Sequence, residues 1–367
     1  MICMRTLIYP INETEPEMDL LESAARILRS GGLVAFPTET VYGLGASALD
    51  AAAAGRIYEA KGRPSDNPLI VHIAERAEAE ECCRTTDLFY LLADAFWPGP
   101  LTMILPKRNS IPLSVTGGLD TVAVRMPAHP VARGLLRCAG IPIAAPSANL
   151  SGHPSPTEAS HVIHDLDGRI DMILAAGPCQ IGLESTVVRL EGDRLRLLRP
   201  GGVTREALEN CIGASRVLLD PAVTERLEEG VKPQSPGMKY RHYAPRASVI
   251  LLDGEDTAVC SEMQRRLRED PRCGILCYDE DLSMLWGDRT LSMGKALDGN
   301  TQAHRLFSCL RAFDDMEIDT VYARVPAKRG MGLALYNRLA RAAGFRIEKA
   351  AEKEDRSESA EDQTRGN

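Results

Sequence analysis

The chain has 367 residues, of which 44% are hydrophobic and 26% are charged, and its formal net charge at pH 7 is −8. This length predicts two domains, and the composition is typical of an ordinary globular protein. The negative net charge disfavours non-specific electrostatic binding to nucleic acid or to an anionic membrane. Any anion site must therefore be a local cluster of cations.

The N-terminal stretch 1–19 lacks the continuous apolar core of a signal peptide, and no apolar run approaches the ~18 residues needed to span a bilayer. The ten cysteines show no CxxC motif and no zinc-like spacing. We therefore expect a cytoplasmic protein with reduced thiols and no membrane contact.

Apolar runs alternate with helical patterns along the first part of the chain. The expected strands are 33–36, 69–73, 101–105, 121–126 and 141–145, and the expected helices between them are 48–60, 88–96 and 131–139. Asp87 has a suitable side chain to cap the second of these helices. Two more expected strands, 185–190 and 194–200, flank Glu-Gly-Asp, which is a hairpin signal. The pattern predicts a mixed α/β domain over residues 1–214.

Residues 215–246 are predicted to be a linker, because the periodicity weakens there. Its segment PQSPGMKYRHYAP (233–245) is rich in proline, basic and aromatic residues, which favours an ordered linker that docks. A second, smaller α/β domain with a parallel sheet is predicted over 247–347. Its expected strands are 248–253, 273–279 and 319–326, and its expected helices are 259–269, 302–316 and 333–343. The tail 348–367 is predicted to be disordered.

The stretch KGRPSDNPLIVH (61–72) places two cations before a buried strand, and the chain has no GxxxxGK[ST] or GxGxxG phosphate loop. Read locally, KGRP is more often a solvated turn. Pro64, however, favours an extended Arg63, which suits planar recognition of a phosphate or carboxylate. Both interpretations stay open on the local sequence.

Two other stretches place small polar residues after a strand. PTETVYGLGA (37–46) is either a capped turn or a pocket wall, with Gly43 and Gly45 expected to allow a tight return into the next helix. In APSANLSGHPSPT (145–157) the Ser and Asn side chains can simply cap a turn. Arg125 interrupts an apolar strand, where a cation is costly without an anion partner. For Arg125, the sequence favours a structural role and a functional role equally.

His161 and His164 lie at i, i+3 on an expected helix, but no carboxylate or cysteine completes a metal set. Surface histidines are therefore favoured at these positions, and no protein metal ligands are predicted.

The order of these motifs, together with WPGPLT, LRPG, SPGMKYRHYAP and GMGLALYNRLARAAG, resembles the YrdC-like threonylcarbamoyl-AMP synthase family in its long, two-domain form. The resemblance spans about residues 5–345. It implies a twisted mixed-sheet catalytic domain with a concave cleft, followed by a small Rossmann-like domain. It also implies synthesis of threonylcarbamoyl-AMP from L-threonine, bicarbonate and ATP with release of pyrophosphate, with Mg²⁺ carried by ATP. The product would serve a downstream complex that modifies adenosine beside the tRNA anticodon, with at most a weak tRNA contact of the enzyme itself.

The resemblance also implies roles for particular residues. The residues expected around threonine are Thr40, His72, Arg125, Ala145 and Ser185. Those expected to contact ATP are Arg63, Asn67, Thr121, Ser147, Ser155, Arg199 and Tyr243. Lys61, Arg63, Ser147 and Asn149 are the expected catalytic set, because the reaction assembles negative charge that preorganised donors stabilise. We identify no general base, and carbamate formation needs little beyond positioning.

Two alternatives were considered. A nucleic-acid-binding module would share the concave fold, but the chain has net negative charge and no aromatic-basic interleaving. A carbamoyl-adenylating enzyme of the hydrogenase-maturation type carries zinc-finger segments, which the absence of CxxC disfavours. Pyrophosphate release that needs threonine but not RNA would distinguish the synthase from the nucleic-acid-binding module.

Overall fold

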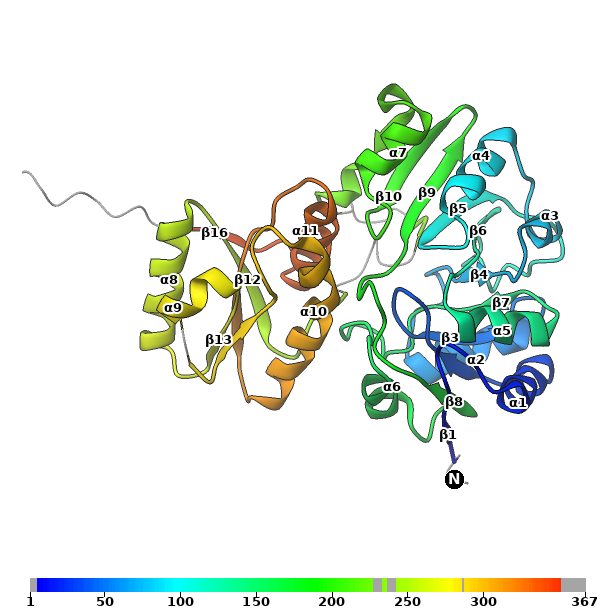
Figure 1. The fold of residues 1–367 in the computed structure, drawn as a ribbon, viewed down its shortest axis with the longest axis horizontal. Helices are drawn as coiled ribbons and strands as arrows, with labels where there is room; N and C mark the ends of the chain where they lie inside the picture. The colour runs from blue at the N-terminus through cyan, green and yellow to red at the C-terminus, as the bar shows by residue number, and fades with distance from the viewer. Residues whose placement is uncertain (1–4, 227–232, 236–241, 286, 351–367) are drawn as a thin grey trace, which may run out of the picture.

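Two α/β domains lie side by side in the computed structural model, which describes residues 5–226, 233–235, 242–285 and 287–350 (Figure 1). No helix in these described ranges is long and apolar enough to cross a membrane. The first domain is built on a large mixed sheet with the strand order β1-β8-β2-β3-β7-β4-β6-β5-β9-β10-β11.

The strands of the first domain are β1 (Leu7–Pro10), β2 (Val34–Phe36), β3 (Gly43–Ser47), β4 (Ile70–His72), β5 (Leu101–Pro106), β6 (Thr121–Arg125), β7 (Ile143–Ala144), β8 (Met172–Ala175), β9 (Thr186–Glu191), β10 (Arg194–Arg199) and β11 (Val217–Leu219). Its α-helices are α1 (Met18–Arg29), α2 (Ala51–Lys61), α3 (Ala79–Cys82), α4 (Asp87–Phe96), α5 (Pro130–Ala139), α6 (Ala159–Leu166) and α7 (Arg205–Ile212), and its 3₁₀ turns are η1 (Arg76–Glu78), η2 (Ala214–Arg216) and η3 (Pro221–Val223).

The second domain has a sheet in which every neighbouring pair of strands is parallel, in the order β14-β13-β15-β12-β16. Helices α10 and α11 lie on the side that faces the first domain, and α8 and α9 lie on the opposite side (Figure 1). Its strands are β12 (Ser248–Asp253), β13 (Cys273–Cys277), β14 (Thr290–Ser292), β15 (Thr320–Arg324) and β16 (Ile347–Lys349). Its helices are α8 (Asp256–Glu269), η4 (Asp279–Asp281), α9 (Leu282–Leu285), α10 (Gly299–Ala312), η5 (Phe313–Asp315) and α11 (Met331–Ala342).

The predicted strands and the hairpin between residues 185 and 200 are confirmed, the latter as the antiparallel pair β9 and β10. Each predicted helix is also present, although Thr86 rather than Asp87 caps α4, through its hydroxyl and the Phe89 amide. The fold class, a mixed α/β domain with a smaller parallel α/β domain, is therefore correct.

The expected tight return at Gly43 and Gly45 is wrong, because both glycines lie in β3, which pairs antiparallel with β2. A β-carbon at Gly45 would lie 2.8 Å from both Phe36 and Ile143 side chains. Glycine is needed here because neighbouring core side chains fill the space, not because the chain turns.

Two expected boundaries differ from the structure. Strand β11 pairs in parallel with β10, so the large sheet continues past residue 214 into the segment predicted as linker. Glu348 and Lys349, predicted to begin the disordered tail, belong to β16, which pairs with β12. Short strands of three residues have too little periodicity to be recognised before their partners are known.

Candidate active site

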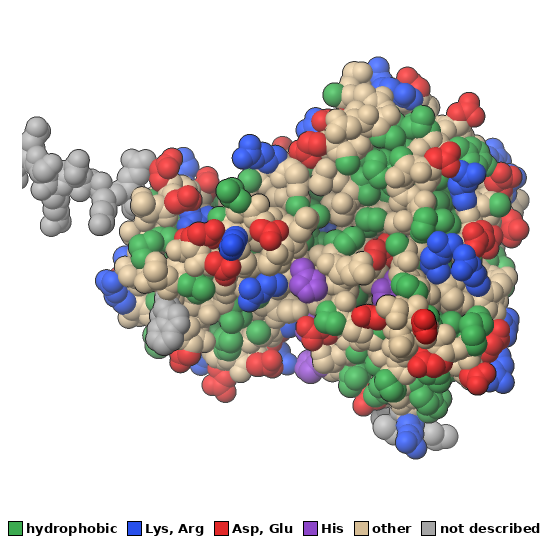
Figure 2. Space-filling view, in the orientation of Figure 1, with side chains coloured by type: hydrophobic (Ala, Val, Ile, Leu, Met, Phe, Trp, Pro, Cys, Tyr) green, Lys and Arg blue, Asp and Glu red, His purple; other side chains and the backbone are tan. Residues whose placement is uncertain are grey.

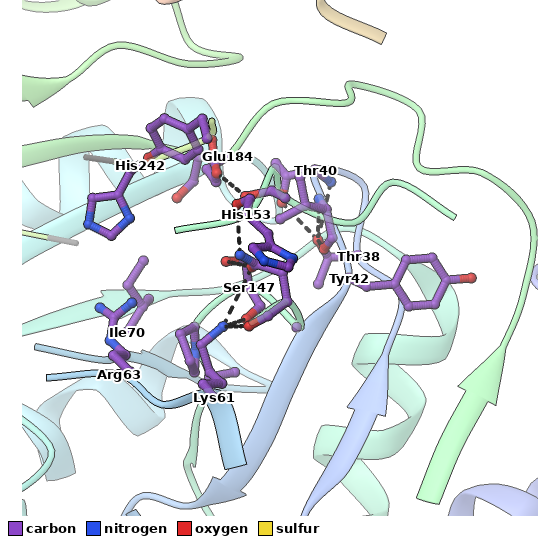
Figure 3. A pocket seen from close by; sticks show the side chains of 18 of the residues that line it. Thr38, Thr40, Tyr42, Lys61, Arg63, Ile70, Ser147, His153, Glu184 and His242 are labelled. Atoms are coloured by element: carbon purple, nitrogen blue, oxygen red, sulfur yellow. Dashed lines mark hydrogen bonds between the residues drawn. The ribbon is translucent and has the colours of Figure 1, made fainter. Parts of the chain in front are cut away.

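One pocket of the first domain gathers residues from the ends of several strands and from the segment that leads into the second domain (Figure 3). Of the residues predicted to act in the site, all but Asn67 and Thr121 line this pocket. Its lining includes the predicted Thr40, Lys61, Arg63, His72, Arg125, Ala145, Ser147, Asn149, Ser155, Ser185, Arg199 and Tyr243.

Lys61 is the last residue of α2 and is only 2% exposed. Gly62 follows it in the left-handed conformation with φ of 60°, which ends the helix and turns the chain. The Nζ of Lys61 donates to the carbonyl oxygens of Ser147, at 2.6 Å, and of Asn149 (Figure 3). The lysine thus holds the loop that follows β7 against the end of α2.

Burial and the nearby Arg63 lower the pKa of Lys61 well below its usual value. Burial also lowers the pKa of Arg63 to about 10. Burial and mutual repulsion thus disfavour the charged forms of both side chains, and an anionic ligand bound beside them would favour the charged forms.

Arg63 is oriented by the loop that follows it: its Nε donates to the carbonyl of Asn67 at 3.3 Å and its guanidinium to that of Pro68 at 3.1 Å. Asn67 therefore supports the site through its backbone, and its side chain does not line the pocket. Thr121 begins β6 opposite Pro106, also outside the pocket lining.

Arg125 and His72 are register partners on the parallel strands β6 and β4, which places both side chains on the same face of the sheet. Arg125 donates to the Thr40 hydroxyl at 3.0 Å, and it pairs with the buried carboxylate of Glu39 at 2.7 Å. The carboxylate compensates the buried guanidinium that looked costly in the sequence. Thr38 extends the group, with its hydroxyl 2.7 Å from that of Thr40.

The loop after β7 and the strand β10 supply the polar wall. Ser147 donates to the Asn149 side chain at 2.5 Å, so the two residues predicted to act together are in direct contact. Arg199 donates to the carbonyl of Ser185 at 3.1 Å and to its hydroxyl at 3.2 Å. Burial lowers the pKa of Arg199 from its usual value. Ala145 is joined to β4 through its amide, which donates to the Ile70 carbonyl at 2.8 Å.

Glu184, His153 and His242 also line the pocket and were not predicted. Glu184 accepts a hydrogen bond from the hydroxyl of Ser155. Burial opposes its ionisation, but Arg338 and Arg199 outweigh this and lower the pKa of Glu184. In the sequence Glu184 is a single carboxylate next to a serine, and no local signal marks it.

The linker segment 233–245, which we expect to close over the ATP side of the first domain as a lid with Tyr243 at the nucleotide, is described only in part, because residues 236–241 lie outside the described residues. Tyr243 lies against the pocket with φ of 67°, and the amide of Ala244 donates to the Gly152 carbonyl at 3.1 Å. The ring of Tyr243 stacks on Phe307 of the second domain with centroids 5.5 Å apart. This end of the segment is thus fixed to both domains, and closure over a nucleotide stays a prediction.

Acidification is expected to destabilise the fold through His72. Burial, reinforced by Arg125, lowers the pKa of His72 from 6.5 to about 3. Below 6.5 the unfolded chain binds a proton that the folded chain does not bind until about 3, so stability is full above 6.5 and falls as the pH falls. One unit below 6.5 the loss from this group is about 1 kcal/mol.

Urea unfolding at about pH 7.5 and about pH 5.5 measures this loss, and His72→Gln should reduce it by about 1 kcal/mol. Ser308→Ala, which removes a hydrogen bond to Thr157 but no titratable group, is the control and should leave the acid loss unchanged. Equal acid losses in His72→Gln and in the unsubstituted protein would contradict the assignment.

His161 and His164 do not share a site: His161 accepts from the Thr157 amide, and His164 contacts Asp165. Among the residues that the structure describes, no group of three or more His, Cys, Asp or Glu side chains is placed to hold a metal ion.

A pocket of buried cations, hydroxyls and backbone groups at strand ends is typical of an enzyme that binds anionic substrates. Residues 26–201 match the Sua5/YciO/YrdC family model, described as "Telomere recombination", and residues 203–344 match a model described as "Threonylcarbamoyl-AMP synthase, C-terminal domain". The chain belongs to the two-domain threonylcarbamoyl-AMP synthase family.

Individual relatives agree with these matches. A threonylcarbamoyl-AMP synthase from Bacillus subtilis is 47% identical, over 89% of this chain and 94% of its own length. One from Schizosaccharomyces pombe is 40% identical, over 89% of both chains. The crystal structure of Pyrococcus abyssi Sua5 complexed with L-threonine superposes with a TM-score of 0.86 at 44% identity, covering 94% of this chain and 100% of that one.

Proposed function

We propose that this chain is an L-threonylcarbamoyladenylate synthase, a nucleotidyltransferase that condenses L-threonine, bicarbonate and ATP and releases pyrophosphate. The observation that carries the proposal is that Lys61, Arg63, Arg125 and Arg199 all line one pocket of a protein with a net negative charge. The reaction brings together an amino-acid carboxylate, a carbamate and a triphosphate, and such a cluster stabilises this accumulation of negative charge.

In the proposed reaction the threonine amine attacks the carbon of bicarbonate, a carbon–oxygen bond breaks, and water leaves with a proton from the amine, which gives a carbamate. A carbamate oxygen then attacks the α-phosphorus of ATP. The bond to the pyrophosphate oxygen breaks, and pyrophosphate carries away the electron pair. The protein's contribution is to hold the reactants in line and to supply donors, since neither step requires a strong base from the protein. No side chain of the described pocket is assigned as a general base.

Threonine and ATP are proposed to bind in different parts of the pocket. Thr40, His72 and Arg125 lie together at one side, where they would receive the threonine carboxylate and hydroxyl. The ATP would lie toward Arg63, Ser147 and Arg199. These roles rest on the resemblance and on the grouping of side chains.

Mg²⁺ is proposed to enter with ATP, where it would offset charge on the triphosphate. The pocket fits such an ion only as a partner of the phosphates. Glu184, a carboxylate at its wall, is already engaged by Ser155 and Arg338. Magnesium bound by substrate phosphates and water needs few protein ligands.

Mass-spectrometric detection of threonylcarbamoyl-adenylate from purified protein, ATP, threonine and bicarbonate tests the proposal. The product should appear without RNA and should disappear when any one substrate is omitted. Formation of pyrophosphate that does not depend on threonine would contradict it.

Use of the product by a tRNA-modifying transfer complex is part of the same proposal. Acidic and basic side chains are interspersed over the face of the molecule in Figure 2. Any tRNA contact is therefore expected to be weak and salt-sensitive.

Serine is expected to be a slow substrate rather than a non-substrate. Threonine differs from it by one methyl group, which is worth about 1–3 kcal/mol in a pocket, or roughly 10- to 200-fold in kcat/KM. Competition between the two amino acids, with both adenylates measured by mass, gives the ratio directly. A complete absence of the serine product at saturating serine would contradict a pocket that discriminates by the methyl alone.

A further inference from the structure

Helix α11 of the second domain carries three polar side chains that are buried. Asn337, Arg338 and Arg341 are 1%, 0% and 4% exposed, within a helix whose apolar residues pack on the parallel sheet. A fully buried guanidinium is costly unless its donors are paired, so the partners of Arg338 indicate what it does.

Most of these partners belong to the first domain. The Nε of Arg338 donates to the Glu184 carboxylate at 2.7 Å, and its two terminal nitrogens donate to the carbonyls of Pro200, at 2.9 Å, and Glu184, at 3.3 Å. Within its own helix it donates to the Asn337 side chain at 2.9 Å. The guanidinium also lies 5.4 Å from the centre of the Tyr243 ring.

Glu184 links Arg338 to the pocket, because it contacts both Arg338 and a residue of the pocket lining. One of its oxygens accepts from Arg338 and the other accepts from the Ser155 hydroxyl, which lines the site. Glu184 is also the neighbour of Ser185, whose carbonyl and hydroxyl hold Arg199. The charge of Glu184, and with it the orientation of two pocket residues, therefore depends on a side chain of the other domain.

The backbone of the same loop is held between the domains. The amides of Ile181 and Gly182 donate to the carbonyls of Glu39 and Thr40, which belong to the loop that carries the Arg125 partners. On the opposite side, a β-carbon at Gly182 would come within 2.5 Å of the His304 backbone of α10. The loop thus approaches α10 so closely that no side chain fits at position 182.

We propose that Arg338 of the second domain is a positioning residue of the synthase site, which fixes Glu184 and thereby Ser155 and, through the adjacent Ser185, Arg199, two residues expected to contact ATP. This inference rests on the proposed function. The second domain then helps to hold active-site residues in place. Separating it from the first domain would weaken ATP binding, independently of the chemical step.

Three variants separate positioning from plain stability. Arg338→Met keeps the length of the side chain and removes its charge, so Glu184 stays buried without a cation. Arg338→Met combined with Glu184→Gln removes that unpaired charge as well. Arg338→Lys keeps the charge but not the planar guanidinium that donates to four acceptors. The matched control is Ser308→Ala, which removes the 3.0 Å hydrogen bond between Ser308 and Thr157, another contact between the domains.

The ATP and threonine KM values, kcat and the thermal midpoint are measured for each full-length protein. We expect Arg338→Met to raise the ATP KM at least about tenfold and to lower the midpoint. The double variant should recover most of the thermal midpoint while its ATP KM stays raised. The ATP KM of Arg338→Lys should lie between those of Arg338→Met and the unsubstituted protein. Ser308→Ala should change the ATP KM less than about twofold, as expected for a contact outside the pocket.

Recovery of the ATP KM together with the midpoint in the double variant would overturn the inference, since Arg338 would then act only on stability. An ATP KM within about twofold of the unsubstituted protein in all Arg338 variants would overturn it too. If the unsubstituted protein makes no threonylcarbamoyl-adenylate, the proposed function fails. Binding of a fluorescent ATP analogue to the same variants then tests the positioning separately, with the same expected order of affinities.

Discussion

Replacing Lys61 by methionine is expected to reduce kcat at saturating substrates by roughly 100- to 1,000-fold, the cost of removing one preorganised donor from a charge-stabilising site. The Nζ of Lys61 holds the carbonyls of Ser147 and Asn149 at the pocket wall. Burial and Arg63 lower the pKa of the Lys61 amine, and an anionic substrate bound beside it would favour the charged form. Methionine has nearly the same length but neither charge nor donors, so both contributions are lost together. Pyrophosphate release under saturating ATP, threonine and bicarbonate measures the effect.

Lys107 offers a matched control because its Nζ also holds a backbone carbonyl, that of Ile111 at 3.0 Å, away from the pocket lining. Lys107→Met should keep kcat within about twofold. Lys61→Arg should not rescue activity, since a planar guanidinium does not place a donor where the Nζ contacts the carbonyls of both Ser147 and Asn149. A Lys61→Met enzyme that keeps more than about a tenth of the original kcat would contradict the role, because one donor in such a site is worth more.

Arg125→Ala is expected to raise the KM for threonine by roughly 10- to 100-fold, because a charge-assisted contact with the carboxylate is worth about 1.5–3 kcal/mol. Removing Arg125 also leaves Glu39 as a buried carboxylate without its cation, which costs about 3–5 kcal/mol of stability. The measurement is therefore best made on the pair Arg125→Ala and Arg125→Ala with Glu39→Gln, by initial rates at varied threonine.

Both variants should show the raised threonine KM, while only the first should show a large loss of thermal stability. Arg125→Lys should rescue poorly, since it lacks the planar fork. The ATP KM serves as an internal control and should change less than about threefold, because Arg125 lies on the Thr40 side of the pocket. An unchanged threonine KM in the double variant would show that another group binds the carboxylate.

The sequence predicted those strands that are continuous apolar runs, such as 33–36 and 121–126, because such runs are buried on both faces of a sheet. It did not predict β1, β3, β8, β11, β14 or β16. The local pattern left KGRP, PTETVYGLGA and APSANLSG open between turns and pocket walls, and the resemblance identified their residues as site residues. The resemblance supplied the order of the motifs and thus the roles. Their spatial grouping around Lys61 and Arg125 is an observation of the structure.

The features that sequence reasoning missed depend on contacts between distant segments. Glycines at 43 and 45 are typical of a turn, yet they form a strand because Phe36 and Ile143 fill the space beside Gly45. Arg338 did leave a signal: a charged residue in a helix that is otherwise apolar on several faces requires a partner. The identity of that partner, 154 positions earlier in the chain, could not be read from local pattern.

Val41 and Leu183 belong to the first domain, yet both are buried in the apolar cluster of the second, with Phe307 and Leu335. The boundary between the domains in the sequence is thus not a boundary in the hydrophobic core. A chain of this fold that ended after η3 would leave these two side chains facing water beside its own pocket. Loss of the second domain by truncation alone would therefore expose apolar surface, which polar replacements, or a new cover, at Val41 and Leu183 would remove.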